Sequence, residues 1–220
     1  MKVGTDGVLL GAWTPVSGCR RALDIGTGSG LIALMLAQRE PILSVLGIDV
    51  DASAASQAAE NFAASPWPEQ LRAKHCSLQA LTGDDRLLGS FDLLVSNPPY
   101  FVDSLKNPDE QRRAARHADT LRLDELMACS ARLLASDGTL ALILPADQEE
   151  QAVARAAGYG LIPYRITHVR TRAHKPAKRV LLAFSRQIRV LQTDEFVLTD
   201  NDNAPRSEAY QNLCKDFYLA

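Results

Sequence analysis

The chain alternates short apolar runs with longer amphipathic stretches. Runs rich in Val, Leu and Ile at strand length, bounded by turn residues, predict strands over 21–25, 43–49, 72–78, 91–96, 139–144, 164–169 and 179–184. Between them, apolar residues recur at helical spacing and predict helices over 7–13, 31–38, 52–64, 120–135 and 147–157. This alternation predicts an α/β fold with a doubly wound, mostly parallel, seven-stranded sheet.

The pattern changes in the last part of the chain, which is more polar. We expect residues 1–187 to form the main domain. Residues 188–220 are expected to form a short C-terminal extension packed on that domain, with a strand near 196–198 and a helix over 207–219.

Composition favours one cytoplasmic domain. The chain has 220 residues, of which 46% are hydrophobic, enough for one substantial core. Its formal net charge of −2 argues neither for nor against a nucleic-acid partner. It contains neither a secretory leader nor an apolar run of membrane-spanning length, so we expect no membrane association. The four cysteines are scattered and predict neither disulfides nor a metal site.

The strand over 91–96 ends abruptly at Asn97-Pro98-Pro99-Tyr100. The prolines stop the strand and stiffen the turn, at a sheet edge where open α/β proteins bind ligands. The Asn97 side-chain oxygen and the Pro98 carbonyl can accept both hydrogens of a planar –NH₂ group, and Tyr100 can stack on a flat base. These bonds strengthen as the attacking nitrogen gains positive charge. We interpret all four residues as catalytic; the alternative is a purely structural rigid loop.

A glycine-rich turn follows the first predicted strand, with the pattern Asp24-x-Gly26-x-Gly28-x-Gly30. It does not match the dinucleotide fingerprint, because Leu31 occupies the position of the third glycine. A carboxylate so close to the turn would repel a pyrophosphate, but it suits a ligand with an α-ammonium group, such as S-adenosylmethionine. The alternative is a simple reversal of the chain.

The second predicted strand ends at Asp49. An acid at this place can accept hydrogen bonds from both ribose hydroxyls of a nucleotide, and Val50 would then pack on the adenine face. Asn97 is expected to line the same cofactor site. The alternative is that Asp49 or Asp51 caps the following helix; we assign the ribose to Asp49 and the cap to Asp51 or Ser53.

Taken in order, the glycine turn, Asp49 and Asn97-Pro98-Pro99-Tyr100 resemble the Rossmann-like class I S-adenosylmethionine-dependent methyltransferases that modify amino groups. Five further segments are similar to the bacterial tRNA1(Val) (adenine37-N6)-methyltransferase family: 1–7, 9–13, 179–185, 207–210 and 217–219. With them, the likeness covers essentially the whole chain. The resemblance implies methyl transfer to the exocyclic amine of adenosine 37 in the tRNA anticodon loop, with S-adenosylhomocysteine as product. It also implies cofactor contacts for Thr5 and Asp6.

The chain departs from that family at two places. Family members carry aromatic and basic residues ahead of the position of Met1, so we expect this chain to be a short form. The third strand usually ends in an acid that binds the adenine amine, and Ser77 stands there instead. We expect the Ser77 hydroxyl to take over this contact.

A basic band lies between residues 165 and 189, which include eight Lys or Arg, two His and no acid. Such bands bind phosphates, which predicts tRNA as the partner; the alternative is a solvated charged loop. The residues expected to contact RNA are Arg112, Arg113, Arg170, Arg172, Lys175, Lys178 and Arg179. The sequence leaves the oligomeric state open, and a monomer is compatible with it.

Other functions share part of these features. Protein-glutamine methyltransferases normally have a helical domain before the glycine turn, rRNA guanine-N2 enzymes are expected to be longer, and DNA adenine enzymes should carry a target-recognition insert. A catalytically silent, cofactor-binding RNA-binding module is the alternative from outside the enzymes. The intact Asn97-Pro98-Pro99-Tyr100 turn argues against that alternative.

Overall fold

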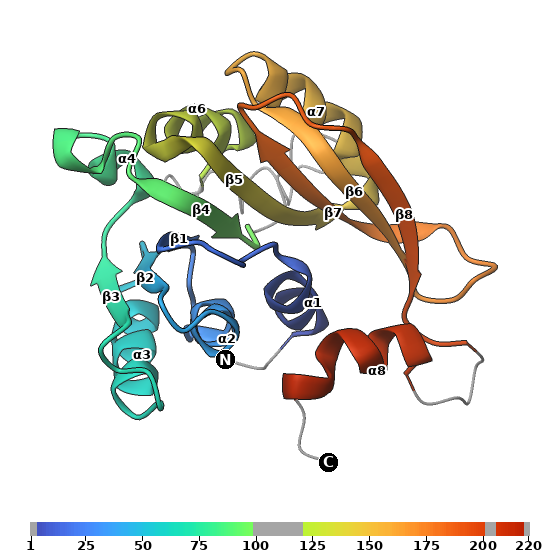
Figure 1. The fold of residues 1–220 in the computed structure, drawn as a ribbon, viewed down its shortest axis with the longest axis horizontal. Helices are drawn as coiled ribbons and strands as arrows, with labels where there is room; N and C mark the ends of the chain where they lie inside the picture. The colour runs from blue at the N-terminus through green and yellow to red at the C-terminus, as the bar shows by residue number, and fades with distance from the viewer. Residues whose placement is uncertain (1–3, 99–120, 201–205, 218–220) are drawn as a thin grey trace, which may run out of the picture.

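The computed structural model describes residues 4–98, 121–200 and 206–217. Eight strands within these ranges form one sheet, in the order β3-β2-β1-β4-β5-β7-β6-β8 (Figure 1). They are β1 (Arg21–Ile25), β2 (Ser44–Asp49), β3 (Leu71–His75), β4 (Phe91–Ser96), β5 (Leu134–Pro145), β6 (Ile162–Arg170), β7 (Ala177–Ser185) and β8 (Gln192–Val197).

The helices connect these strands. They are α1 (Thr5–Trp13), α2 (Leu31–Arg39), α3 (Ala52–Ala63), α4 (Leu78–Leu81), α6 (Leu123–Leu133), α7 (Glu149–Ala157) and α8 (Glu208–Cys214). Short 3₁₀ turns are η1 (Asp85–Leu87), η2 (Ala146–Gln148) and η3 (Lys215–Phe217). Helix α1 starts at Thr5 after Gly4, without a side-chain cap.

The sheet confirms the doubly wound, mostly parallel α/β fold. Within the described sheet only β7 runs against its neighbours, β5 and β6. The expected number of seven strands is wrong, because β8 pairs in parallel with β6 and extends the sheet to eight. The strand expected near 196–198 is therefore longer and belongs to the main sheet.

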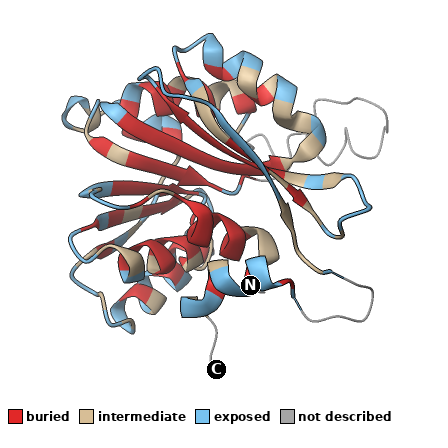
Figure 2. Ribbon diagram, turned by 45° about the vertical axis from the view of Figure 1, so that its right-hand side comes forward, coloured by how far each residue is buried: buried red, intermediate tan, exposed pale blue. Residues whose placement is uncertain are grey.

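Helices cover both faces of the sheet, which gives three layers (Figure 1). Helices α1, α2, α3 and α8 pack on one face, and α4, α6 and α7 pack on the other. Successive side chains of a strand point to opposite faces, so Leu93 and Val95 of β4 join the first layer while Leu94 joins the second. The central strands are therefore mostly apolar and buried on both sides (Figure 2).

The described ranges hold neither a helix that could span a membrane nor a cluster of metal ligands. None of the helices there combines the length and apolar character needed to cross a bilayer. In the same ranges, no three His, Cys, Asp or Glu side chains gather as metal ligands would.

Candidate active site

The register of the sheet brings three predicted site residues to neighbouring positions. Ile25 at the end of β1 pairs with Ile48 of β2 on one side and with Ser96 of β4 on the other. The next residue on each strand is Gly26, Asp49 or Asn97. Because adjacent strands lie about 4.8 Å apart, Asp49 and Asn97 flank the start of the glycine turn.

The three glycines of the turn all have positive φ, which favours glycine. Gly30, at φ 85°, also lies close to the Phe62 ring: an added Cβ would stand 2.4 Å from the ring atom Cε1. At Gly26, by contrast, an added Cβ would meet no atom of the described chain within 4 Å. The turn is thus packed against α3 at its far end and open at its near end, where a ligand can approach the backbone.

Asp24 lies beneath this turn and is completely buried. Its Oδ2 accepts a hydrogen bond from the Thr27 hydroxyl at 2.7 Å. Its Oδ1 is buried and accepts no hydrogen bond from the part of the chain that the structure describes. Burial raises the pKa of Asp24 to about 6, against the opposing effect of the Thr27 hydrogen bond. A cationic group of a ligand near Oδ1 would offset that cost.

Asp49 supports the turn from the neighbouring strand. Its Oδ2 accepts a hydrogen bond from the Gly28 amide, and its Oδ1 accepts one from the Asp51 amide, both at 2.9 Å. Each carboxylate oxygen can accept a second hydrogen bond, so ribose hydroxyls still have acceptors here. The cap of α3 is Asp51, which accepts from the Ser53 and Ala54 amides.

The residues around the expected adenine position have mixed roles. Val50 is 52% exposed, unusual for its type, and is available to cover a flat ring. A ring nitrogen of His75 lies 3.0 Å from the Val50 carbonyl oxygen. Ser77 caps α4, because its hydroxyl oxygen accepts a hydrogen bond from the Ala80 amide at 3.2 Å. The Ser77 proton remains available as a donor.

The catalytic loop is only partly described. Asn97 is exposed, whereas Pro98 is buried directly behind it. The Ser96 hydroxyl donates to the Ile25 carbonyl at 2.8 Å and ties the end of β4 to the end of β1. Of the expected site residues, Pro99, Tyr100, Arg112 and Arg113 lie outside the described residues.

The first turn of α1 lies beside the glycine turn. A Cβ added at Gly7 would stand 3.3 Å from Cδ2 of Leu31, the first residue of α2. Asp6, expected at the cofactor, accepts a hydrogen bond at 2.8 Å from Nε of Arg179, expected at the RNA. Thr5 lies 3.4 Å from a guanidinium nitrogen of Arg206.

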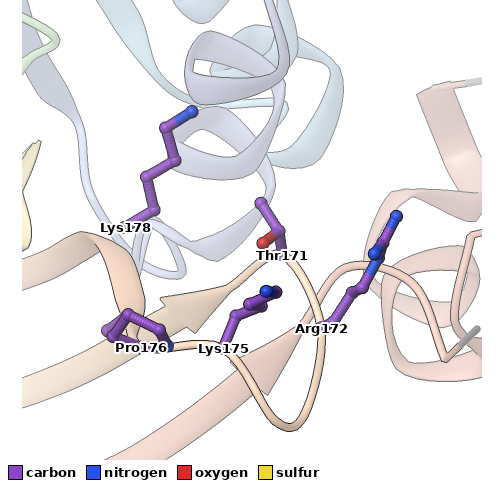
Figure 3. Close-up of a pocket in the computed structure, with 6 residues that line it drawn as sticks. Thr171, Arg172, Lys175, Pro176 and Lys178 are labelled. Atoms are coloured by element: carbon purple, nitrogen blue, oxygen red, sulfur yellow. The ribbon is translucent and has the colours of Figure 1, made fainter. Parts of the chain in front are cut away.

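The basic band forms the loop between β6 and β7. Because β6 runs parallel to β4 and β5, this loop lies at the same sheet edge as Asn97. An open pocket of about 500 Å³ lies along it (Figure 3). Its lining residues are Thr171, Arg172, Lys175, Pro176, Ala177 and Lys178. Arg170 lies at the base of the loop and forms an ion pair with Glu195 of β8, at 2.5 Å.

Sequence reasoning missed two residues that shape the site. Thr27 holds Asp24, and Ser96 holds the end of β4, both through hydroxyl groups. Thr27 lies inside the glycine pattern and could have been suspected from its spacing to Asp24. Ser96 offered no such signal, because its partner is a backbone carbonyl 71 residues away.

These residues fit S-adenosylmethionine. The unpaired buried oxygen of Asp24 suits the α-ammonium group, and Asp49 has acceptors for the ribose. The open face of Gly26 leaves room for the ligand, and Val50 offers an apolar surface. The fold and the site together define an S-adenosylmethionine-dependent methyltransferase.

Comparison with known proteins agrees with this class. The methyltransferase small domain family matches residues 8–157, and the chain belongs to that family. Among solved structures, a protein described as a predicted O-methyltransferase from Agrobacterium tumefaciens superposes with a TM-score of 0.76 over 98% of both chains. At 16% identity this similarity concerns the fold alone.

Curated relatives give a finer assignment. The tRNA1(Val) (adenine(37)-N6)-methyltransferase of Parabacteroides distasonis is 44% identical over 219 residues, covering 100% of this chain and 91% of the relative. The protein of the same name from Aeromonas hydrophila is 44% identical with the same coverage. The chain is a member of the tRNA1(Val) (adenine(37)-N6)-methyltransferase family, and the resemblance predicted from the sequence is confirmed.

Proposed function

We propose that this chain transfers a methyl group from S-adenosylmethionine to the exocyclic amine of adenosine 37 in tRNA1(Val). The observation that carries the reaction type is the position of Asn97 at the end of β4, beside the open glycine turn. The substrate rests on the relatives of that name, which match the whole chain.

The cofactor is held by residues on several neighbouring elements. Asp24 binds the α-ammonium group, Gly26 and Gly28 admit the ligand against the backbone, and Asp49 binds the ribose. Val50 covers the face of the adenine, and the Ser77 hydroxyl donates to its edge. The other residues that line the cofactor site are Thr5, Asp6, Gly30 and Asn97. When bound, S-adenosylmethionine supplies an electrophilic methyl group on a sulfonium sulfur.

The turn after β4 holds the nucleophile. An exocyclic amine is weakly nucleophilic because its lone pair is delocalised into the ring. The Asn97 side-chain oxygen and the Pro98 carbonyl accept its two hydrogens and stabilise the charge that develops on nitrogen. Pro99 keeps the turn rigid, and Tyr100 stacks on the flipped base. The amine then loses a proton to solvent, and no strong base is needed.

The β6–β7 loop binds the RNA backbone. Lys175 and Lys178 line the open pocket together with Arg172, at the sheet edge that carries Asn97. Arg112, Arg113 and Arg170 add positive charge toward the same substrate. Binding of this kind follows phosphate positions and does not read the bases. A tRNA substrate implies a cytoplasmic enzyme, and one chain holds all the groups named, so a monomer suffices.

Nucleoside analysis tests this proposal. The protein is incubated with tRNA from cells that lack the modification and with isotope-labelled S-adenosylmethionine, and the digested RNA is analysed by mass spectrometry. We expect labelled N6-methyladenosine. Labelled N2-methylguanosine would show that the substrate is a guanine amine instead, and label in protein glutamine would show that it is a glutamine amide. Either result would overturn the proposed substrate. An unlabelled pool, with normal cofactor binding, would favour a catalytically silent module.

A further inference from the structure

Arg179 belongs by its charge to the basic band, but its side chain also contacts helix α1. Its Nε donates to Oδ2 of Asp6 at 2.8 Å, across 173 residues of sequence. The pair is partly shielded from water, with side-chain exposures of 17% for Arg179 and 28% for Asp6. Shielding makes such a contact stronger than an ordinary surface ion pair.

The location of the pair connects it to the cofactor site. Arg179 lies opposite Pro145, at the end of β5, on the sheet edge where the ligand is expected. Asp6 precedes Gly7, whose backbone packs against Leu31 at the start of α2. The first turn of α1 therefore extends from Arg179 on one side to the end of the glycine turn on the other.

The same guanidinium also contacts the start of β7, next to the basic loop. Its Nη1 donates to the Lys178 carbonyl at 3.0 Å, and Lys178 lines the open pocket shown in Figure 3. One planar side chain thus contacts α1 through Nε and the backbone at the start of β7 through Nη1. A lysine offers a single point charge and cannot reproduce this fork.

We propose that Arg179 is a positioning residue of the cofactor site, which acts through Asp6 to hold the first turn of α1 beside the glycine turn. The inference rests on the proposed function in one respect, that S-adenosylmethionine binds at that turn. It reassigns Arg179 from direct phosphate binding to cofactor binding. Loss of the contact weakens cofactor binding even when no RNA is present.

Calorimetric titration with S-adenosylhomocysteine, in the absence of RNA, tests this role. We expect Arg179→Gln and Asp6→Asn each to raise the Kd about tenfold, the loss of one shielded ionic hydrogen bond. The double variant should bind no more weakly than either single variant, because both remove the same contact. Arg179→Lys should bind between the wild type and Arg179→Gln.

Lys175→Gln is the matched control, since it removes a positive charge from the same basic band, in the loop just before β7. It should leave the Kd for S-adenosylhomocysteine unchanged and raise the KM for tRNA. Thermal unfolding of each variant shows whether the fold is kept. An Arg179→Gln variant that binds S-adenosylhomocysteine normally but has a raised KM for tRNA would overturn the inference. A double variant whose Kd rises by the product of the two single-variant fold-changes would also overturn it, because the two residues would then act independently.

The titration is independent of the RNA substrate. If Arg179→Gln weakens S-adenosylhomocysteine binding and no tRNA is methylated, the role of Arg179 stands and the proposed substrate falls. If tRNA is methylated and the Kd is unaffected, the reverse holds.

Discussion

Asn97 is exposed at the end of β4, so its truncation leaves no hole in the core. We expect Asn97→Ala to lower kcat about 10²- to 10³-fold, the usual effect of losing one group that stabilises transition-state charge. The Kd for S-adenosylhomocysteine should rise far less, by about two- to threefold, because Asn97 is only one of several residues around the cofactor. Single-turnover methylation and calorimetric titration measure the two effects.

Asn97→Asp is the informative companion, because it keeps an oxygen acceptor at the same place. It should retain more activity than Asn97→Ala. Full turnover in the alanine variant, with normal cofactor binding, would refute the assigned role.

The Asp24 carboxylate is completely buried, so its negative charge is costly in the ligand-free protein. A rise of its pKa from 3.8 to about 6 corresponds to about 3 kcal/mol of stability that is present at low pH and lost as pH rises through 6. Asp24→Asn should therefore raise the free energy of unfolding at pH 7.5 by about 1–3 kcal/mol. Urea denaturation of both proteins measures it, and the difference should shrink toward pH 4. A variant that is less stable at pH 7.5 would contradict this.

The same carboxylate should make cofactor binding depend on pH. Only ionised Asp24 attracts the α-ammonium group, so the affinity for S-adenosylhomocysteine should fall as pH drops below about 6, approaching tenfold per pH unit. Above pH 7 the affinity should be constant. Titrations between pH 5 and 8 test this, with Asp24→Asn as the weak and flat control. A wild-type profile that is also flat would remove Asp24 from the site.

At the scale of elements, β8 and α8 belong to the main fold. Helix α8 buries Tyr210 and Cys214 against the layer formed by α1 and α2. The Tyr210 ring also contacts the ring of Phe196, near the end of β8. Tyr210→Ala should lower the free energy of unfolding by about 3 kcal/mol, as for other buried aromatic residues. Asn212→Ala, on the exposed side of the same helix, should change it by less than about 0.5 kcal/mol. Equal effects would mean that α8 is not part of the folded unit.

Some elements were predicted to the residue and others were not, for physical reasons. The strands Arg21–Ile25 and Phe91–Ser96 are central, mostly apolar on both faces and soon followed by glycine or proline, so their pattern is clear. Strand β8 begins with exposed polar residues, and only its pairing with β6 makes it a strand. Edge strands of this kind depend on a partner that local sequence does not contain.

The candidate site divides in the same way. Asp24, Gly26, Asp49 and Asn97 could be predicted because each lies within a few residues of a strand end, and parallel strand ends meet at one edge. The Asp6–Arg179 contact could not, since it joins residues 173 positions apart and charge alone assigned Arg179 to RNA.

For the whole molecule, the mild net charge of −2 conceals a basic edge that should govern RNA binding. The affinity for tRNA should fall steeply with salt, with a logarithmic slope of about −0.7 to −0.9 for each phosphate contact. The Lys175→Gln and Lys178→Gln double variant should reduce that slope by about 1–2. Filter binding between about 50 and 200 mM salt measures this slope. An unchanged slope would place the RNA elsewhere.

The central claim is that this chain methylates one exocyclic amine, that of adenosine 37. Two tRNA1(Val) transcripts, identical except that one carries guanosine at position 37, are incubated with the protein and labelled S-adenosylmethionine, and the label is mapped by nuclease digestion and mass spectrometry. The account predicts about one methyl group per adenosine-37 transcript, found as N6-methyladenosine at that position, and none in the guanosine-37 transcript. Equal labelling of both transcripts, or label at any other position, would contradict it.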